Sequence, residues 1–110
     1  RFKDLAAWIH SHLQADLSME ALAARTFLSV RQFTRAFKAE LGTTPASFVE
    51  EARLAEAGRR LSASRRRVSI EGVARSVGYA GADVFRRAFE RRFGVTPVNY
   101  RSRFGSGSRS

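Results

Sequence analysis

The chain contains no cysteine, which excludes disulfide bonds and thiolate metal sites. It has no apolar run near the ~20 residues that a membrane-spanning helix needs. It has no signal peptide either, so we expect a cytoplasmic protein or an excised piece of a larger chain. His10 and His12 lie two positions apart, on different sides of a helix, and do not form a metal site by themselves. No nucleophile elbow, phosphate-binding loop or carboxylate pair is present, so we expect neither an enzyme nor a cofactor.

Acidic residues are scarce. The chain has 20 basic and 10 acidic residues, which gives a formal net charge of +10, and the basic residues are 18 arginines and 2 lysines. Arginine forks suit phosphates and guanine edges. A genomic preference for arginine codons explains the ratio of arginine to lysine equally well, but it does not explain the net charge. The charge indicates an anionic partner.

The sequence contains an internal repeat. The segments LSMEALA and FTRAFKAELGTTP, at 17–23 and 33–45, return as VSIEGVA and FRRAFERRFGVTP at 68–74 and 85–97. In a basic chain, such a repeat indicates two copies of one structural unit that both contact one long anionic partner.

Only helical periodicity is visible. We expect helices over about 2–14, 18–26, 29–41, 45–62, 69–77, 82–93 and 97–103. The predicted N-caps are Ser18, Ser29 and Ser69, and the predicted stops are Gly42 and Gly94. Thr44-Pro45 and Thr96-Pro97 each place a capping hydroxyl before a proline at the first helical position.

Each copy has a short helix, a tight turn and a second helix, which is the helix-turn-helix plan. Ala23 and Ala74 are small enough for the two helices to cross closely. Gly78, four residues after Ala74, suits the turn of the second copy. The first copy has Phe27 at this position, so we expect its turn to adopt a conformation that tolerates a side chain.

The second helix of each copy has an apolar face, with Val30, Phe33, Phe37 and Leu41 or Phe85, Phe89 and Phe93, and a polar face. The outward residues are Arg31, Thr34, Arg35 and Lys38 in the first copy, and Asp83, Arg86, Arg87 and Glu90 in the second. Such a stripe fits a major groove ~12 Å wide, where arginine bonds guanine, threonine meets a thymine methyl or a phosphate, and aspartate accepts from cytosine N4. A single surface helix often carries a polar stripe, but two copies behind capped helices and turns favour DNA binding.

Residues 16–103 resemble the DNA-binding domain of the AraC/XylS family of bacterial transcription regulators. The segment IEGVARSVGYAGADVFRRAFERRFGVTPVNYR corresponds to the family's signature region. The resemblance implies an all-α, seven-helix domain over 1–104, made of two helix-turn-helix units joined by a long connector helix. The ranges are about 16–42 and 68–94 for the units, 45–62 for the connector, 97–103 for the last helix and 105–110 for a flexible tail.

The resemblance also implies a site. The base-reading positions fall on Arg31, Thr34 and Arg35, and on Asp83, Arg86 and Arg87; the supporting or phosphate-binding positions fall on Ser29, Lys38, Gly81 and Ala82. The two recognition helices would enter successive major grooves ~34 Å apart, and a connector roughly 26 Å long is of that order. Ala82 offers only a methyl group and Gly81 lacks a capping hydroxyl, so we expect looser reading by the second unit.

The expected partner is double-stranded DNA at the bacterial nucleoid. The family resemblance also implies a sensor or dimerisation domain on the N-terminal side of the intact chain, and it permits contact with the sigma subunit of RNA polymerase. Asp83 and Glu90 keep an alternative open, in which only the first unit reads DNA and the second docks on RNA polymerase or another protein. Arg65–Arg67 is either a solvated turn or a phosphate contact. Trp8 and Tyr79 are expected in the core or an interface.

Overall fold

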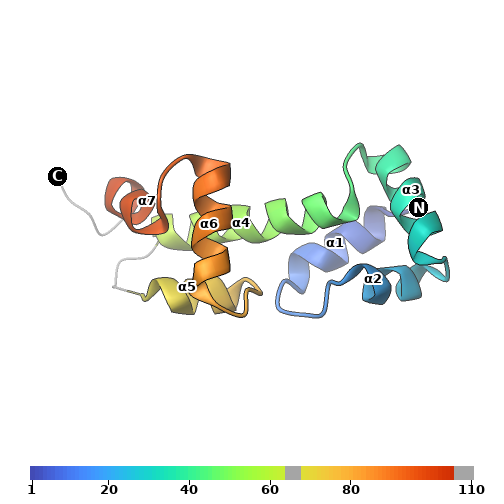
Figure 1. The fold of residues 1–110 in the computed structure, drawn as a ribbon, viewed down its shortest axis with the longest axis horizontal. Helices are drawn as coiled ribbons and strands as arrows, with labels where there is room; N and C mark the ends of the chain where they lie inside the picture. The colour runs from blue at the N-terminus through green and yellow to red at the C-terminus, as the bar shows by residue number, and fades with distance from the viewer. Residues whose placement is uncertain (64–67, 106–110) are drawn as a thin grey trace. The chain divides into compact units, whose positions relative to one another are not determined.

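The computed structural model describes residues 1–63 and 68–105 (Figure 1). These residues form seven helices and no strand, which confirms the all-α fold. The helices are α1 (Lys3–Ser11), α2 (Met19–Thr26), α3 (Val30–Leu41), α4 (Pro45–Ala63), α5 (Ile70–Ser76), α6 (Ala82–Phe93) and α7 (Pro97–Phe104). The predictions for Arg65–Arg67 and for the tail after Gly105 concern residues outside the described ranges.

The chain divides into two compact units, Arg1–Ala52 and Arg53–Ser110, and the boundary falls within α4. Each unit has its own apolar core. The finer domain limits given by the sequence stay predictions.

The core of the first unit is built around three phenylalanine rings. Phe2, Phe33 and Phe37 are buried, and their ring centroids lie 5.5–5.8 Å apart. Residues of α1, of the segment after it, of α2 and of the start of α4 complete this core: Leu5, Ile9, Leu13, Leu17, Leu22, Ala23, Val49 and Ala52 are buried, and Trp8 and Met19 pack against them. Packing of this face fixes how α3 is oriented within the unit.

Val30 departs from the prediction, because it is 38% exposed instead of packed with Phe33 and Phe37. A helical side chain leans over the turn that precedes it. Val30 occupies the first position of α3 and therefore has no preceding turn of its own helix to cover.

The core of the second unit is built on Phe85 and Phe89 of α6, which are both fully buried. Residues of α4 and α5 and the residue after α5 surround them: Leu54, Ala57, Leu61, Val73, Ala74 and Val77. Phe93, Tyr79 and Tyr100 pack at the edge of this core. A Cβ at Gly58 of α4 would lie 3.3 Å from the Tyr100 hydroxyl, so the glycine makes room for α7.

The predicted helix starts and stops are confirmed. Ser18, Ser29, Ser69 and Thr96 each accept a hydrogen bond from the backbone N–H three residues on. Gly42 and Gly94 end α3 and α6 in the left-handed region, with φ of 81° and 78°.

The turn of the first unit accommodates the side chain of Phe27 in a left-handed conformation. Its φ of 62° and ψ of 25° are left-handed, the region that Gly78 also enters with φ of 105° in the second unit. The φ of Phe27 lies in the small left-handed region that is sterically open to residues with a side chain, whereas the φ of Gly78 lies beyond it. For a non-glycine residue this conformation costs of order 1–3 kcal/mol.

Phe37→Ala and Phe89→Ala should each lower the free energy of unfolding by about 3–5 kcal/mol, because each empties a buried ring site. Circular dichroism during thermal unfolding measures the loss. An unchanged melting temperature for either variant would mean that the inward and outward faces of that helix are exchanged.

Candidate nucleic-acid interface

The start of α3 is held by a reciprocal pair of hydrogen bonds. The Ser29 hydroxyl accepts from the Gln32 backbone N–H at 3.1 Å, and the Gln32 side-chain oxygen accepts from the Ser29 N–H at 3.1 Å. This capping box satisfies two backbone donors that a helix start otherwise leaves to solvent. The first turn of α3 contains no acidic residue, so its positive end stays available to an anion.

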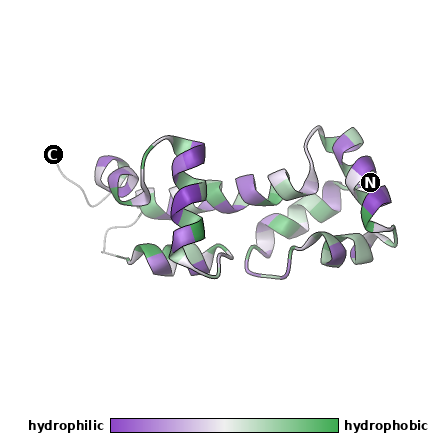
Figure 2. Cartoon of the chain, viewed as in Figure 1, coloured by the Kyte–Doolittle hydropathy of each residue, from purple (hydrophilic) through white to green (hydrophobic). Residues whose placement is uncertain are grey.

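The outward face of α3 is cationic. Arg31, Arg35 and Lys38 are exposed, as the sequence predicts. Thr34 lies on the same face but is half-buried, and its hydroxyl donates to the Val30 carbonyl at 2.8 Å. The helix therefore uses the hydroxyl hydrogen of Thr34, while its methyl group and an oxygen lone pair remain for a ligand. Figure 2 shows hydrophilic and hydrophobic residues in turn along α3 and along α6.

Near its C-terminal end, α3 is tied to the N-terminal segment. Glu40 accepts hydrogen bonds from the Phe2 backbone N–H at 3.0 Å and from the Arg1 amino group at 3.1 Å. These contacts, the Phe2 bond above all, lower the pKa of Glu40. The acidic residue near the end of α3 is thus already engaged within the unit.

The outward face of α6 is electrically mixed. The Asp83 carboxylate accepts from Arg86 at 2.8 Å, in a pair whose side chains are 80% and 46% exposed. Exposed pairs of this kind contribute little to stability, so a ligand can replace either partner. Arg87 and Glu90 are exposed on the same face. The charged residues of this stripe, two acidic and two basic, sum to zero, whereas Arg31, Arg35 and Lys38 sum to +3.

The starts of α3 and α6 differ in capping, as the residues Ser29 and Gly81 predict. Gly81 precedes α6 without any side-chain cap, and Ala82 at the first position is half-buried. The backbone N–H groups of this turn therefore lack the side-chain acceptor that Ser29 supplies to α3.

The sequence analysis missed Val84, which is 57% exposed in the first turn of α6. The repeat pairs it with Gln32, since both lie three residues after the N-cap. Gln32 is held by the capping box, whereas Val84 has no capping partner at Gly81. An exposed apolar side chain at this place suits a thymine methyl. Aligning the two copies position by position could have found it.

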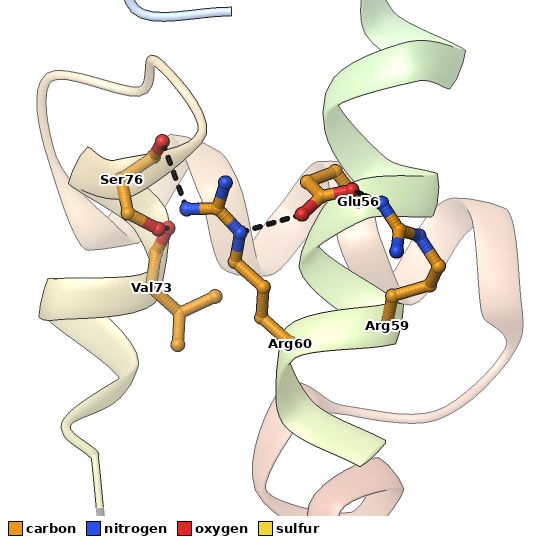
Figure 3. Close-up of polar contacts among 5 residues, drawn as sticks. All are labelled: Glu56, Arg59, Arg60, Val73 and Ser76. Carbon is orange, nitrogen blue, oxygen red and sulfur yellow. Dashed lines mark hydrogen bonds and ion pairs between the residues drawn. The ribbon is translucent and has the colours of Figure 1, made fainter. Parts of the chain in front are cut away.

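An ion-pair network ties α5 to α4 in the second unit (Figure 3). Glu56 pairs with Arg59 and, at 2.7 Å, with Arg60. Arg60 also donates to the Ser76 carbonyl at 3.2 Å, at the end of α5. A cation there complements the negative end of the helix dipole. The network thus orients the first helix of the second helix-turn-helix.

Other residues singled out by the sequence take structural positions. Trp8 is half-buried against the first core and stacks on His12 at 4.3 Å, and Tyr79 packs on Phe85 at 5.4 Å. Among the described residues, no group of three potential ligands gathers around a metal-sized site. Within the same part of the chain, no helix is long and apolar enough to span a bilayer.

Comparison with known proteins identifies the family. A family model described as a helix-turn-helix domain matches residues 22–103. The chain is 33% identical over 93 residues to the probable transcriptional regulator LumQ of Photobacterium leiognathi and 31% identical over 101 residues to the regulatory protein SoxS of Escherichia coli K12. The chain therefore belongs to the AraC-type helix-turn-helix family, as its sequence predicted.

The matches cover different shares of the relatives. The aligned part takes up 84% of this chain and 37% of LumQ, so the chain spans about a third of that relative, but it takes up 92% of both this chain and SoxS. Among solved structures, the DNA-binding domain of AdpA, crystallised in complex with a target DNA, is similar with a TM-score of 0.85 and 32% identity. That likeness covers 92% of this chain and 89% of the AdpA domain.

Ser29→Ala should lower the free energy of unfolding by about 1 kcal/mol, because it removes the side-chain half of the capping box. Chemical denaturation followed by circular dichroism measures it, with Ser11→Ala as a control whose hydroxyl only bonds back within α1. Equal stability of the S29A variant and the parent chain would contradict a structural role for the box.

Proposed function

We propose that this chain binds double-stranded DNA sequence-specifically, as the output domain of a transcription regulator. The observation that carries the proposal is the outward face of α3, where three exposed cations lie on a helix whose opposite side is locked into the core. The transcription-regulator names of the relatives and the DNA complex of the AdpA domain support it.

The two units would contribute unequally to DNA binding. In the first unit, Arg31, Thr34 and Arg35 read bases, while Lys38 and the helix start at Ser29 hold phosphates. This face carries +3 and contributes the larger part of the affinity.

The second unit would also read bases. Arg86 and Arg87 read bases, and Asp83 accepts from cytosine or repels a phosphate that approaches in the wrong register. Gly81 and Ala82 leave the start of α6 open to a phosphate. Since the charges of this face cancel and its helix start has no side-chain cap, we expect it to add little affinity and to read bases more loosely than the first unit.

We further propose that α3 and α6 occupy successive major grooves. The alternative, in which the second unit only docks on RNA polymerase or another protein, rested on Asp83 and Glu90. It is not favoured, because Asp83 is paired with Arg86 and the second unit keeps the capped helix and turn of the first. Contact with the sigma subunit, an N-terminal sensor or dimerisation domain and a place at the bacterial nucleoid stay predictions.

Binding to duplex DNA should weaken steeply with salt, because the basic face displaces counterions. With about 6–8 phosphates contacted, the slope of log K against log salt should be about −5 to −7. Fluorescence anisotropy of a labelled duplex at several salt concentrations gives the slope. A slope near zero would remove DNA as the partner.

Arg35→Ala and Arg87→Ala should relax base preference at two places about 10 base pairs apart, each at a cost of about 1–3 kcal/mol for a bidentate contact. Selection of bound sites from random duplexes with each variant locates the affected bases. If R87A selects the same site as the parent chain, the second unit does not read DNA.

A further inference from the structure

Phe27, at the turn between α2 and α3, combines two unfavourable features. Its ring is 95% exposed, so it contributes almost nothing to the core. Its backbone lies in the left-handed region, with φ of 62°, which bulky residues rarely enter. Such an outlier, once observed, points to a function.

The second unit shows that the turn does not need this ring. At the equivalent position Gly78 adopts φ of 105° without strain. The chain therefore keeps an exposed aromatic ring in the first unit where its own repeat uses glycine. The two units also differ two residues earlier, where the first has the cation Arg25 and the second has the neutral Ser76.

Arg25 is held against the Trp8 ring, in the wall of a groove that Phe27 also lines. It is exposed, and its guanidinium carbon lies 3.8 Å from the centre of the Trp8 ring, a cation–π contact that orients the fork without removing its charge. Trp8, Arg25 and Phe27 contribute to the lining of a groove of about 440 Å³, whose wall also includes Asp4. The turn thus offers an oriented cation and an apolar ring side by side.

The charge of the surrounding segment selects the partner. Between Glu20 in the first turn of α2 and Glu40 near the end of α3, residues 21–39 contain four basic residues and no acidic residue. Asp4, the acid on the groove wall, belongs to α1. Phe27 also lies two residues before Ser29, which opens the reading helix. The α2–α3 turn therefore suits a polyanion that has apolar surface between its charges, since Arg25 offers a cation and Phe27 an apolar ring.

We propose that the α2–α3 turn binds the sugar-phosphate backbone of DNA: Arg25 meets a phosphate and the Phe27 ring packs on the adjacent deoxyribose. This inference rests on the proposed function, since it extends the same interface. Neither contact reads a base, so both act equally on all sequences. The strain at Phe27 then serves to hold the ring out toward the DNA strand.

Two substitutions at one position separate the ring from the backbone. Phe27→Ala removes the ring and keeps a side chain at positive φ, whereas Phe27→Gly removes the ring and relieves the strain. Both should weaken binding about three- to tenfold on specific and random duplexes alike, as expected for lost apolar burial. The salt slope should not change, because no phosphate contact is lost. The melting temperature of F27G should be higher than that of F27A, because only glycine relieves the strain at positive φ.

Arg25 should show the opposite signature. Arg25→Ala should reduce the magnitude of the salt slope by about 1, with uniform loss across sequences, while Arg25→Lys should retain the slope because it keeps the charge. Anisotropy with the complete 110-residue chain, on one selected and one random duplex, measures all four variants beside the parent.

The outcomes are distinct. If the parent chain binds neither duplex, the proposed function itself fails. If the parent binds and both Phe27 variants bind as tightly, the inference is overturned, and the exposed ring serves a protein partner instead. Loss on the selected duplex alone would also overturn it, because a backbone contact does not distinguish sequences.

Discussion

Burial of two pairs of phenylalanine rings determines the rest of this structure. Phe33 and Phe37 on α3, and Phe85 and Phe89 on α6, are each inaccessible to solvent. Each buried ring contributes about 1.5–3 kcal/mol of hydrophobic stabilisation. Because the members of each pair are one helical turn apart, they fix the rotation of the helix about its axis. The opposite side of each helix then has to face outward, and its residues are free to serve a ligand.

The two units use this one scaffold for different surfaces. Each has a capped short helix, a left-handed turn residue and a second helix stopped by glycine. On the outward side, α3 has a capping box and three cations, while α6 starts at an uncapped glycine and its charges cancel. The repeated sequence thus keeps the residues that fold the unit and varies those that face outward. This pattern is what two readers of one duplex need if they recognise different bases.

Most of the fold could be predicted from local signals. Serine caps, Thr-Pro starts and helix-ending glycines act within a few residues of chain, and the stripe of phenylalanines shows which face of each helix is buried. Val30 and Phe27 were harder. The exposure of Val30 depends on its position at the very start of a packed helix. The positive φ of Phe27 depends on the geometry of the turn between the two helices, which local sequence does not reveal. The contact of Arg60 with Ser76 joins residues 16 apart in sequence, so no local pattern announces it.

For the candidate site too, local sequence patterns predicted some features, while others depend on the folded structure. The identity of the outward residues could be read from helical spacing, but their partners could not. The pairing of Asp83 with Arg86, the hydroxyl of Thr34 bound to its own helix and the exposure of Val84 are properties of the folded surface. They change what each side chain can offer to a base. Helical spacing assigned Thr34, Asp83 and Arg86 only by position, and it did not single out Val84.

The central claim is that both outward faces read one duplex, and selection of bound sites from random double-stranded DNA with this chain tests it most directly. The account predicts enriched sites with two clusters of preferred bases, about one helical turn of 10 base pairs apart, and the stronger preference in one cluster. Enrichment of a single cluster, or no enrichment over random sequence, would contradict it.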